Sequence, residues 1–293
     1  YFGIGRGVGM GIVADGKLDL SAQGDARIGE AGRLQSAGLA TLRADGEVAV
    51  AGELRGDGGA AVNAGGTLNV QGLIASAQGA LTMNAEQDLT LGANGSALAS
   101  GPLKAQAGGA LASAGMLSSL ADLALAASRN LTLQGQSLAT GDVRLNAGGR
   151  LVSASSAQTQ AYGALSANAD SATLAGQVVA GGVTNLRTNG ELLLDGSLLA
   201  PGSALTLASG GDLKLAASSA MKAGGLLTAR AGGALLADGA IQGDSDIHLS
   251  ATSDAVLNGN TAANGLLNVT AGKGLGDLRV GQDAHLRAAT TLD

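Results

Sequence analysis

The sequence predicts an all-β fold, a parallel β-helix (β-solenoid) of about 14 coils with about 20 residues each. Three observations predict it: a segment that recurs about every 20 residues, an alternation of apolar and polar residues within each copy, and a composition dominated by small side chains. Gly accounts for 50 of the 293 residues, whereas the chain has one Phe, two Tyr, no Trp and no Cys. Because aromatic residues supply much of a conventional core, a thin, repetitive core of Leu and Ala fits this chain better.

The recurring segment reads apolar residue, any residue, Ala, three further residues, apolar residue. Clear copies begin at Val62, Leu145 and Ala229. With the central small residue as the anchor, the residue two positions earlier is apolar in all 14 copies. The anchors are Ala22, Ala44, Ala64, Ala85, Ala107, Ala127, Ala147, Ala169, Thr188, Ser209, Ala231, Ala251, Ala271 and Ala288. Their separations are 22, 20, 21, 22, 20, 20, 22, 19, 21, 22, 20, 20 and 17 residues, so one copy corresponds to one coil.

Each copy contains short strands. In the segment 205–215, Leu205, Leu207 and Ser209 alternate with polar or small residues, and the alternation resumes at Leu213-Lys214-Leu215. A period of two residues indicates β-strand and predicts that these residues point inward. Two or three such strands per coil can bury their apolar face only against the next coil.

Glycines separate the strands within each copy. Gly pairs such as Gly210-Gly211 predict corners where a positive φ is needed. Apolar pairs such as Leu198-Leu199 and Leu235-Leu236 are expected to add inward residues before the next corner. Four positions after the anchor the residue is apolar in 13 of 14 copies, and Thr173 is the exception.

Composition excludes several classes of protein. The chain has 17 basic and 23 acidic residues, a net charge of −6, which argues against nucleic acid, heparin-like polymers or anionic lipid as the main partner. Gly and polar residues interrupt every apolar run, so no membrane span is predicted. We expect residues 1–17, with alternating Gly3, Gly5, Gly7, Gly9 and Gly11, to form an irregular leading segment or a partial coil, and residues 18–293 to form one continuous rod.

The Ala-Gly-Gly-x-Leu segments, seen at Ala147–Leu151 and Ala231–Leu235, resemble the haemagglutinin repeats of the filamentous haemagglutinin family. The resemblance implies a right-handed β-helical shaft, secreted or held at the bacterial cell surface. Its export would use an outer-membrane two-partner-secretion transporter, and its role would be to project adhesive regions toward host cells or other bacteria. The stalk of a contact-dependent growth inhibition exoprotein is the alternative within the same resemblance. The chain shows no Asn-Pro-Asn-Gly-like motif, initiator Met, signal peptide or polar cap, so an internal segment of a longer fibre is expected.

One short motif has a known binding chemistry. Arg55-Gly56-Asp57 can offer a carboxylate to a receptor-bound metal and a guanidinium to an acidic pocket. It lies at a predicted corner, before Gly58-Gly59, where exposure is expected. The hypothesis is receptor binding through these three residues, and the alternative is an incidental corner sequence.

No catalytic, cofactor-binding or metal-binding residue is predicted. Sugar-processing β-helices need a groove with paired carboxylates, and here Tyr162 is the one aromatic residue within the repeats. His248 and His285 are isolated and are expected at the surface. Asp244 and Asp246 form a local pair for which a calcium site is the alternative to a polar corner. A broken acidic column, three residues after the anchor, is interpreted as polar corners: Asp25, Glu47, Asp88, Glu191, Asp212 and Asp254.

The outward positions of the copies vary. The residue before the anchor reads Ser21, Arg43, Asn63, Asn84 and Gln106 in the first five copies. A surface that recognises a periodic ligand would repeat its side chains, so this variation favours a spacer whose selected property is continuity of the fold.

Overall fold

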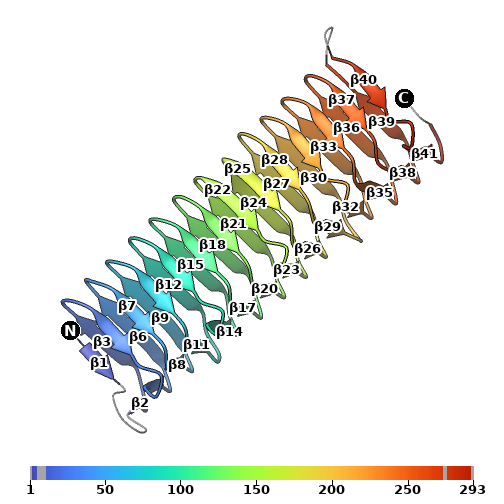
Figure 1. The fold of residues 1–293 in the computed structure, drawn as a ribbon. Coiled ribbons are helices and arrows are strands. Elements are labelled where there is room, and N and C mark those ends of the chain that lie inside the picture. Colours follow the sequence, from blue (N-terminus) through green and yellow to red (C-terminus); the bar gives the residue numbers. More distant parts are fainter. Residues whose placement is uncertain (1, 5–10, 273–275, 292–293) are drawn as a thin grey trace. The chain divides into compact units, whose positions relative to one another are not determined.

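The computed structural model describes residues 2–4, 11–272 and 276–291 of the chain. It forms two compact units, residues 1–148 and 149–293, and every regular element in the described part is a β-strand (Figure 1). Within each unit the strands pair in parallel in three sheets, here called A, B and C. The predicted parallel β-solenoid is therefore confirmed. Gly5, Gly7 and Gly9 of the predicted leading segment lie outside the described residues.

The first unit contains seven strands of each sheet. Its sheet A consists of β1 (Phe2–Ile4), β4 (Ala26–Ile28), β7 (Val48–Val50), β10 (Leu68–Val70), β13 (Leu89–Leu91), β16 (Leu111–Ser113) and β19 (Leu131–Leu133). Its sheet B consists of β2 (Gly11–Ala14), β5 (Arg33–Ser36), β8 (Glu53–Gly56), β11 (Leu73–Ser76), β14 (Ser96–Ala99), β17 (Met116–Ser119) and β20 (Gln136–Ala139). Its sheet C consists of β3 (Leu18–Ala22), β6 (Leu39–Ala44), β9 (Gly59–Ala64), β12 (Leu81–Ala85), β15 (Leu103–Ala107), β18 (Leu123–Ala127) and β21 (Val143–Ala147).

The second unit has the same three sheets. Its sheet A consists of β22 (Arg150–Ser153), β25 (Ser171–Leu174), β28 (Leu192–Leu194), β31 (Leu213–Leu215), β34 (Leu235–Ala237), β37 (Ala255–Leu257) and β40 (Leu278–Val280). Its sheet B consists of β23 (Gln158–Ala161), β26 (Gln177–Ala180), β29 (Ser197–Ala200), β32 (Ala220–Ala223), β35 (Ala240–Gly243), β38 (Thr261–Ala263) and β41 (Leu286–Ala288). Its sheet C consists of β24 (Leu165–Ala169), β27 (Thr184–Thr188), β30 (Leu205–Ser209), β33 (Leu227–Ala231), β36 (Ile247–Ala251) and β39 (Leu267–Thr270).

One coil is a strand of sheet A, a strand of B and a strand of C, joined at an A–B corner and a B–C corner. A C–A corner then leads to the next coil. Equivalent residues of successive coils lie directly beside one another, as in the register of Leu207 with Leu186 on one side and Ala229 on the other. Inward residues therefore form continuous columns, and Leu205, Leu207 and Ser209 are buried as predicted.

Most of the predicted repeat register is confirmed. The first twelve anchors are the last residues of sheet C strands, from Ala22 at the end of β3 to Ala251 at the end of β36. Placing the last anchor at Ala288 was wrong. Ala288 belongs to sheet B, where it pairs with Ala263, so the 17-residue separation is an error of alignment. Sheet C has thirteen strands in the described residues, seven in the first unit and six in the second.

Two further details of the inward assignment need correction. Only one residue of each apolar pair points inward: Leu198 and Leu235 are fully buried, whereas Leu199 and Leu236 are partly exposed. Thr173 also faces outward, because the C–A corner before β25 consists of Asp170 alone. The inward residue of that coil is Ala172, one position earlier than in the other copies.

The expectation that corner glycines need a positive φ was wrong. Among the described residues, Gly59 alone has a φ in the left-handed range, at +147°. The corners instead need glycine because successive corners stack in close contact. A Cβ at Gly72 would lie closer than 3.0 Å to the carbonyl oxygens of Gly52 and Ala51 in the preceding coil. Glycine removes a steric conflict between coils rather than permitting an unusual backbone conformation.

The A–B corners have two main lengths. Most contain two residues, such as Ala51-Gly52 between β7 and β8. In every third coil the corner contains a four-residue turn instead, which begins at Gly29, Gly92, Ala154, Ala216 or Gly281, and at the last of these corners His285 follows the turn. The insertion explains the anchor separations, because the value of 22 residues recurs at every third interval.

Replacing an inward Leu tests the assignment of faces. Leu207 is fully buried, so Leu207→Asp places a carboxylate among apolar columns without a partner. We expect it to lower the free energy of unfolding by about 3–5 kcal/mol, because an uncompensated buried charge is strongly destabilising. The matched control is Ala208→Asp, on the outward side of the same strand, with an expected change below about 0.5 kcal/mol. Equal melting curves for the two variants, followed by circular dichroism, would contradict the assignment.

Candidate functional site

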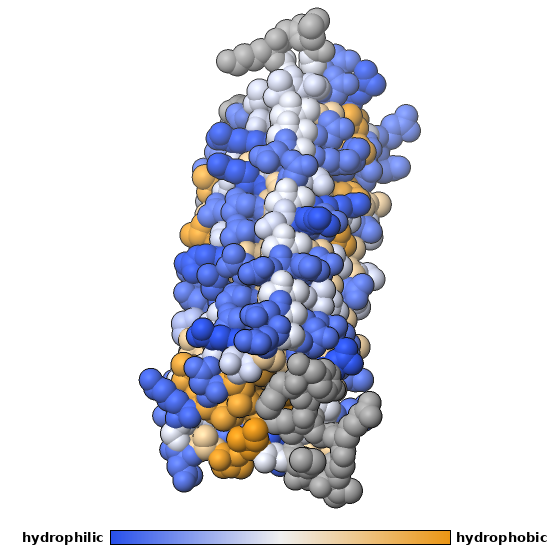
Figure 2. All heavy atoms as spheres, turned by 90° about the vertical axis from the view of Figure 1, so that its left-hand side faces the viewer, coloured by the Kyte–Doolittle hydropathy of each residue, from blue (hydrophilic) through white to orange (hydrophobic). Residues whose placement is uncertain are grey.

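Acidic and basic side chains occupy different positions within the coil. Of the 22 described Asp and Glu residues, 20 lie at corners, whereas 13 of the 15 described Lys and Arg residues lie on strands. Asp favours turns because its carboxylate bonds nearby backbone groups, while the long stems of Lys and Arg lie along an outward sheet face. Hydrophilic side chains cover much of the face seen in Figure 2, on both sides of a line of near-neutral residues.

Corner aspartates bind the backbone of the next coil. At the C–A corner, Asp25 Oδ1 accepts a hydrogen bond from the Glu47 N–H at 2.9 Å, and Asp212 Oδ1 accepts one from the Ala234 N–H at 3.0 Å. Asp88 and Asp254 do the same at other C–A corners, to Ala110 and Asp277. Asp122 and Asp246 repeat the arrangement at the B–C corner, to Asp142 and Leu266. These six carboxylates therefore satisfy backbone donors that would otherwise lack a partner at the corner.

The aspartate contact has a second requirement, a glycine in the next coil. A Cβ at Gly46 would collide with the Asp25 carboxylate, and one at Gly233 with that of Asp212. Gly109, Gly141 and Gly265 stand in the same relation to Asp88, Asp122 and Asp246. The Asp of one coil and the Gly of the next form a structural pair, spaced one coil apart in sequence.

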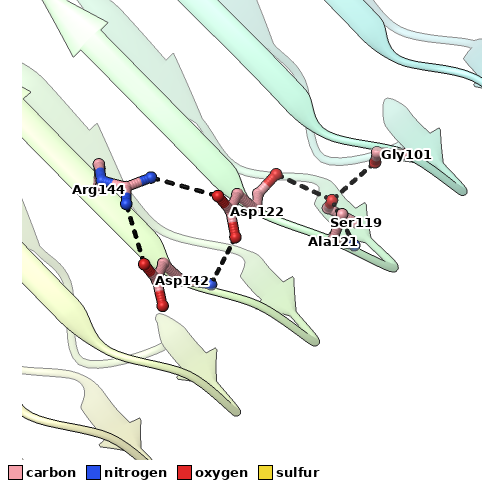
Figure 3. A network of polar contacts seen from close by, with 6 residues as sticks. All are labelled: Gly101, Ser119, Ala121, Asp122, Asp142 and Arg144. Atoms are coloured by element: carbon pink, nitrogen blue, oxygen red, sulfur yellow. Dashed lines mark hydrogen bonds and ion pairs between the residues drawn. The ribbon is translucent and has the colours of Figure 1, made fainter.

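Figure 3 shows one of these clusters, at successive B–C corners of the first unit. Arg144 bridges two carboxylates, with its Nη1 atom 3.3 Å from Asp122 Oδ2 and its Nη2 atom 2.9 Å from Asp142 Oδ2. The buried Ser119 hydroxyl lies 2.9 Å from the carbonyl oxygens of both Gly101 and Asp122, and it accepts the Ala121 N–H at 3.1 Å. All of these contacts join neighbouring coils or parts of one corner, so the cluster stabilises the stack.

The glutamates of the acidic column behave differently from the aspartates. Glu191 Oε1 lies 2.7 Å from Lys214 Nζ on the next strand of sheet A, and Glu47 pairs with Arg27 at 3.9 Å. The hydrogen bond to Glu191 raises the pKa of Lys214, and a hydrogen bond to Asp277 raises the pKa of Arg279. Asp residues also reach cations on the sheet face, since Asp212 Oδ2 lies 3.7 Å from Lys214 Nζ, but the shorter Asp side chain binds the adjacent backbone as well.

The two carboxylates of the suggested calcium pair have different partners. Asp246 binds the Leu266 N–H at 2.9 Å, while Asp244 lies 3.9 Å from Lys222 Nζ. His248 is a partly exposed outward residue of β36, and His285 is exposed. The described part of the chain contains no group of three or more His, Asp or Glu side chains placed to hold a metal ion. It also contains no helix long and apolar enough to cross a membrane.

Arg55, Gly56 and Asp57 lie at the end of β8 and the start of a B–C corner. Arg55 is exposed and its Nε atom donates a hydrogen bond to Asp57 Oδ1 at 3.1 Å, so the two charged groups contact each other. Gly56 is buried, and a Cβ there would collide with the backbone of Gly59. The Asp57 N–H donates to the Ser36 carbonyl at 2.9 Å, which holds the motif in the stack. The ion pair uses Arg55 Nε and Asp57 Oδ1, and receptor binding through this motif stays a prediction.

Sequence reasoning missed the Asp–Gly pairs and the four-residue turns. The sequence does contain a signal for the pairs. An Asp three residues after one anchor is accompanied by a Gly two residues after the next anchor, as in Asp25 with Gly46 and Asp212 with Gly233. The signal for the turns was the recurrence of the 22-residue separation.

The fold and its corner chemistry define a class: a parallel β-solenoid in which the repeated polar contacts are structural. The haemagglutinin repeat family matches the chain at residues 13–93, 76–155 and 160–217, which together exceed half of its length. The chain therefore belongs to the filamentous haemagglutinin family. No curated protein and no solved structure gives a significant match.

The Asp–Gly pair can be tested by mutation at the B–C corner of the second unit. Asp246→Ala removes the acceptor of the Leu266 N–H and should lower the free energy of unfolding by about 1–2 kcal/mol. The matched control is Asp244→Ala, two residues away, whose ion pair is long and partly exposed, with an expected loss below about 0.5 kcal/mol. Chemical denaturation of each variant measures both values, and equal losses would refute the capping role.

Gly265→Ala extends the test to the other member of the pair. Its Cβ would collide with the Asp246 carboxylate and would also lie 3.1 Å from the Asp246 backbone nitrogen. The substitution should therefore cost less in the Asp246→Ala background than in the original chain, with a coupling of about 1 kcal/mol. Additive effects in the double variant would show that the carboxylate and the glycine are independent.

Proposed function

We propose that this chain is a shaft segment of a large adhesin of the filamentous haemagglutinin type, secreted or held at the bacterial surface. The observation that carries the proposal is the contrast between the two sides of the same strands. In sheet C of the second unit, Leu205, Leu227 and Ile247 form one buried inward column. The outward column on the same strands changes from Ala208 to Arg230 to Ser250. The residue type therefore repeats on the buried side, where coils pack on one another, and varies on the outward side.

The proposed mechanism is mechanical. Neighbouring coils of each unit share backbone hydrogen bonds in three parallel sheets, so a displaced strand would break bonds to the coils on both sides. Corner aspartates add bonds between successive corners, as from Asp88 to the Ala110 N–H. Such a stack resists bending and extension, which suits an element that holds adhesive regions away from the cell.

The cellular setting of the proposal rests on family membership. Export would take place through an outer-membrane transporter of two-partner secretion, and the projected regions would meet a host receptor or another bacterial surface. A contact-dependent growth inhibition exoprotein would use the same kind of shaft, so the alternative differs in what the shaft carries. We propose no catalytic role, in keeping with the structural character of the family.

A direct receptor-binding role is the second candidate, because Arg55 is exposed and Asp57 is partly exposed beside it. The shaft role predicts that purified chain added to cultured host cells shows no saturable binding. Binding through the motif predicts saturable binding that Asp57→Glu abolishes, because the longer side chain moves the carboxylate. Asp45→Glu is the matched control, since Asp45 is a corner carboxylate outside the motif. Saturable binding that is lost in Asp57→Glu and kept in Asp45→Glu would show that the shaft is not the only role of the chain.

Fold continuity can be tested by deletion in phase and out of phase with the coils. Removing residues 154–215 takes out one interval between four-residue turns and joins Ser153 to Ala216, which is the start of an equivalent turn. We expect this variant to keep its β-sheet circular dichroism and to melt within about 5 °C of the original chain. Removing residues 154–205 instead joins β22 to the middle of a sheet C strand, and we expect it to lose the cooperative transition. Equal melting of the two variants would contradict the proposal.

A further inference from the structure

Most basic side chains on the outward faces of sheets A and B have a carboxylate partner. Lys214 of sheet A pairs with Glu191 at 2.7 Å, and Arg33 of sheet B pairs with Glu53 at 3.1 Å. These carboxylates lie at or beside corners, where the acidic residues are concentrated. Sheet C differs, because most of its basic side chains have no such partner among the described residues.

Two of these unpaired residues lie close together on sheet C of the second unit. Arg187 of β27 and Arg230 of β33 are exposed, and within the described part of the chain their side chains form no ion pair or hydrogen bond. The two strands lie on either side of β30 (Figure 1), and Ala208 separates the two arginines in one outward column. The arginines are therefore two strand spacings apart, about 10 Å, across a residue with a small side chain.

The composition of the neighbouring corners explains why these two arginines are unpaired. The C–A corner after Arg230 consists of residues 232–234, which are two glycines and an alanine. The C–A corner after Arg187 contains Glu191, but the carboxylate of Glu191 is bound by Lys214. Both guanidinium groups are therefore open to a carboxylate of another molecule.

The C–A edge of the first unit carries an arrangement of opposite charge. Asp45, Gly65 and Glu86 are the first residues of three successive C–A corners. Asp45 and Glu86 are exposed, and their carboxylates form no ion pair or hydrogen bond with any residue that the structure describes. Gly65 lies between them, and a Cβ there would collide with the backbone of Asp45. The two carboxylates are thus also two strand spacings apart, across a residue without a side chain.

A hollow of about 400 Å³ lies between these two carboxylates. Asp45, Gly65 and Glu86 line it together with Asn63 and Arg43, and Arg43 forms no ion pair with either carboxylate. Two carboxylates and one guanidinium give the lining a net negative charge. An arginine that enters from another molecule would find carboxylate acceptors there, and the planar guanidinium group matches a carboxylate in geometry.

We propose that Arg187 and Arg230 on sheet C of one copy dock on Asp45 and Glu86 at the C–A edge of a second copy of this chain. Opposite charge and equal spacing select this partner, because each pair spans two coils across a small residue. The contact is heterologous, so each copy keeps one of its two surfaces free and further copies can add. The shaft role holds whether or not copies associate, so the two proposals can fail separately.

The exposure of all four side chains sets the strength of this contact. Exposed ion pairs each contribute little to stability, and salt screens them. A contact made of two such pairs belongs with the small, transient interfaces. We therefore expect association at high protein concentration and low ionic strength, and dissociation as the salt concentration rises.

Two charge-reversed variants of the full chain test the docking by sedimentation velocity at low salt. The first combines Arg187→Glu with Arg230→Glu, and the second combines Asp45→Arg with Glu86→Arg. Each variant alone places like charges on both sides of the contact, so its dissociation constant should rise at least about tenfold. An equimolar mixture should associate again, because the unchanged arginines of the second variant meet the unchanged carboxylates of the first. The two reversed surfaces are complementary to each other as well.

The matched control combines Lys104→Glu with Arg287→Glu. Both residues are exposed and without an ion pair among the described residues, and the change in net charge equals that of the first variant. Circular dichroism checks that every variant folds, and the control should associate as the original chain does. An original chain that is monomeric at all concentrations at low salt would overturn the proposal. A mixture that stays monomeric, reversed variants that associate undiminished, or an equal loss in the control would also overturn it.

Discussion

The structure depends on one constraint: equivalent parts of successive coils lie one strand spacing apart, backbone over backbone. At a strand this spacing is favourable, because each N–H and C=O finds a partner in the neighbouring coil. At a corner it leaves no room for a Cβ directed along the stack, so Gly72 lies where any side chain would meet the carbonyls of Ala51 and Gly52. The high glycine content is a consequence of stacking corners.

The same constraint explains the polar residues. A corner N–H that does not meet a carbonyl of the neighbouring coil must find another acceptor, and a short carboxylate such as that of Asp246 supplies one to Leu266. Some buried hydroxyls donate to corner carbonyls, as Ser209 does to those of Gly190 and Asp212. The acidic composition of the chain therefore reflects how its corners are built, and the outward strand positions stay free to vary.

Much of the fold could be predicted from the sequence, because an anchor such as Ala147 and the apolar residues around it recur with little change. The role of the glycines could not be predicted. A Gly that prevents a steric clash with the preceding coil cannot be told by sequence from a Gly that adopts a positive φ. The inward residue at Ala172 was missed because a single deletion at the preceding corner shifts the register by one. The anchor at Ala288 was misplaced because the irregular final coil lies where the pattern is weakest.

The candidate site was less predictable than the fold. The motif Arg55-Gly56-Asp57 could be identified from the amino-acid sequence. Its ion pair and the burial of Gly56 depend on its position at the end of β8 and could not. The Asp–Gly pairs involve residues about 20 positions apart, and they are recognisable only once copies are aligned and their contacts across coils are known.

The most direct test of the central claim compares Gly72→Ala with Gly72→Asn by urea denaturation. If corners need glycine because coils stack closely, both substitutions destabilise the chain and Asn does so more, since it adds more atoms where Gly52 and Ala51 already lie. If the corner needed a left-handed backbone, Asn would be tolerated better than Ala, because Asn adopts that conformation more readily. A lower unfolding midpoint for Gly72→Asn than for Gly72→Ala is the result the stacking account predicts, and the reverse order would contradict it.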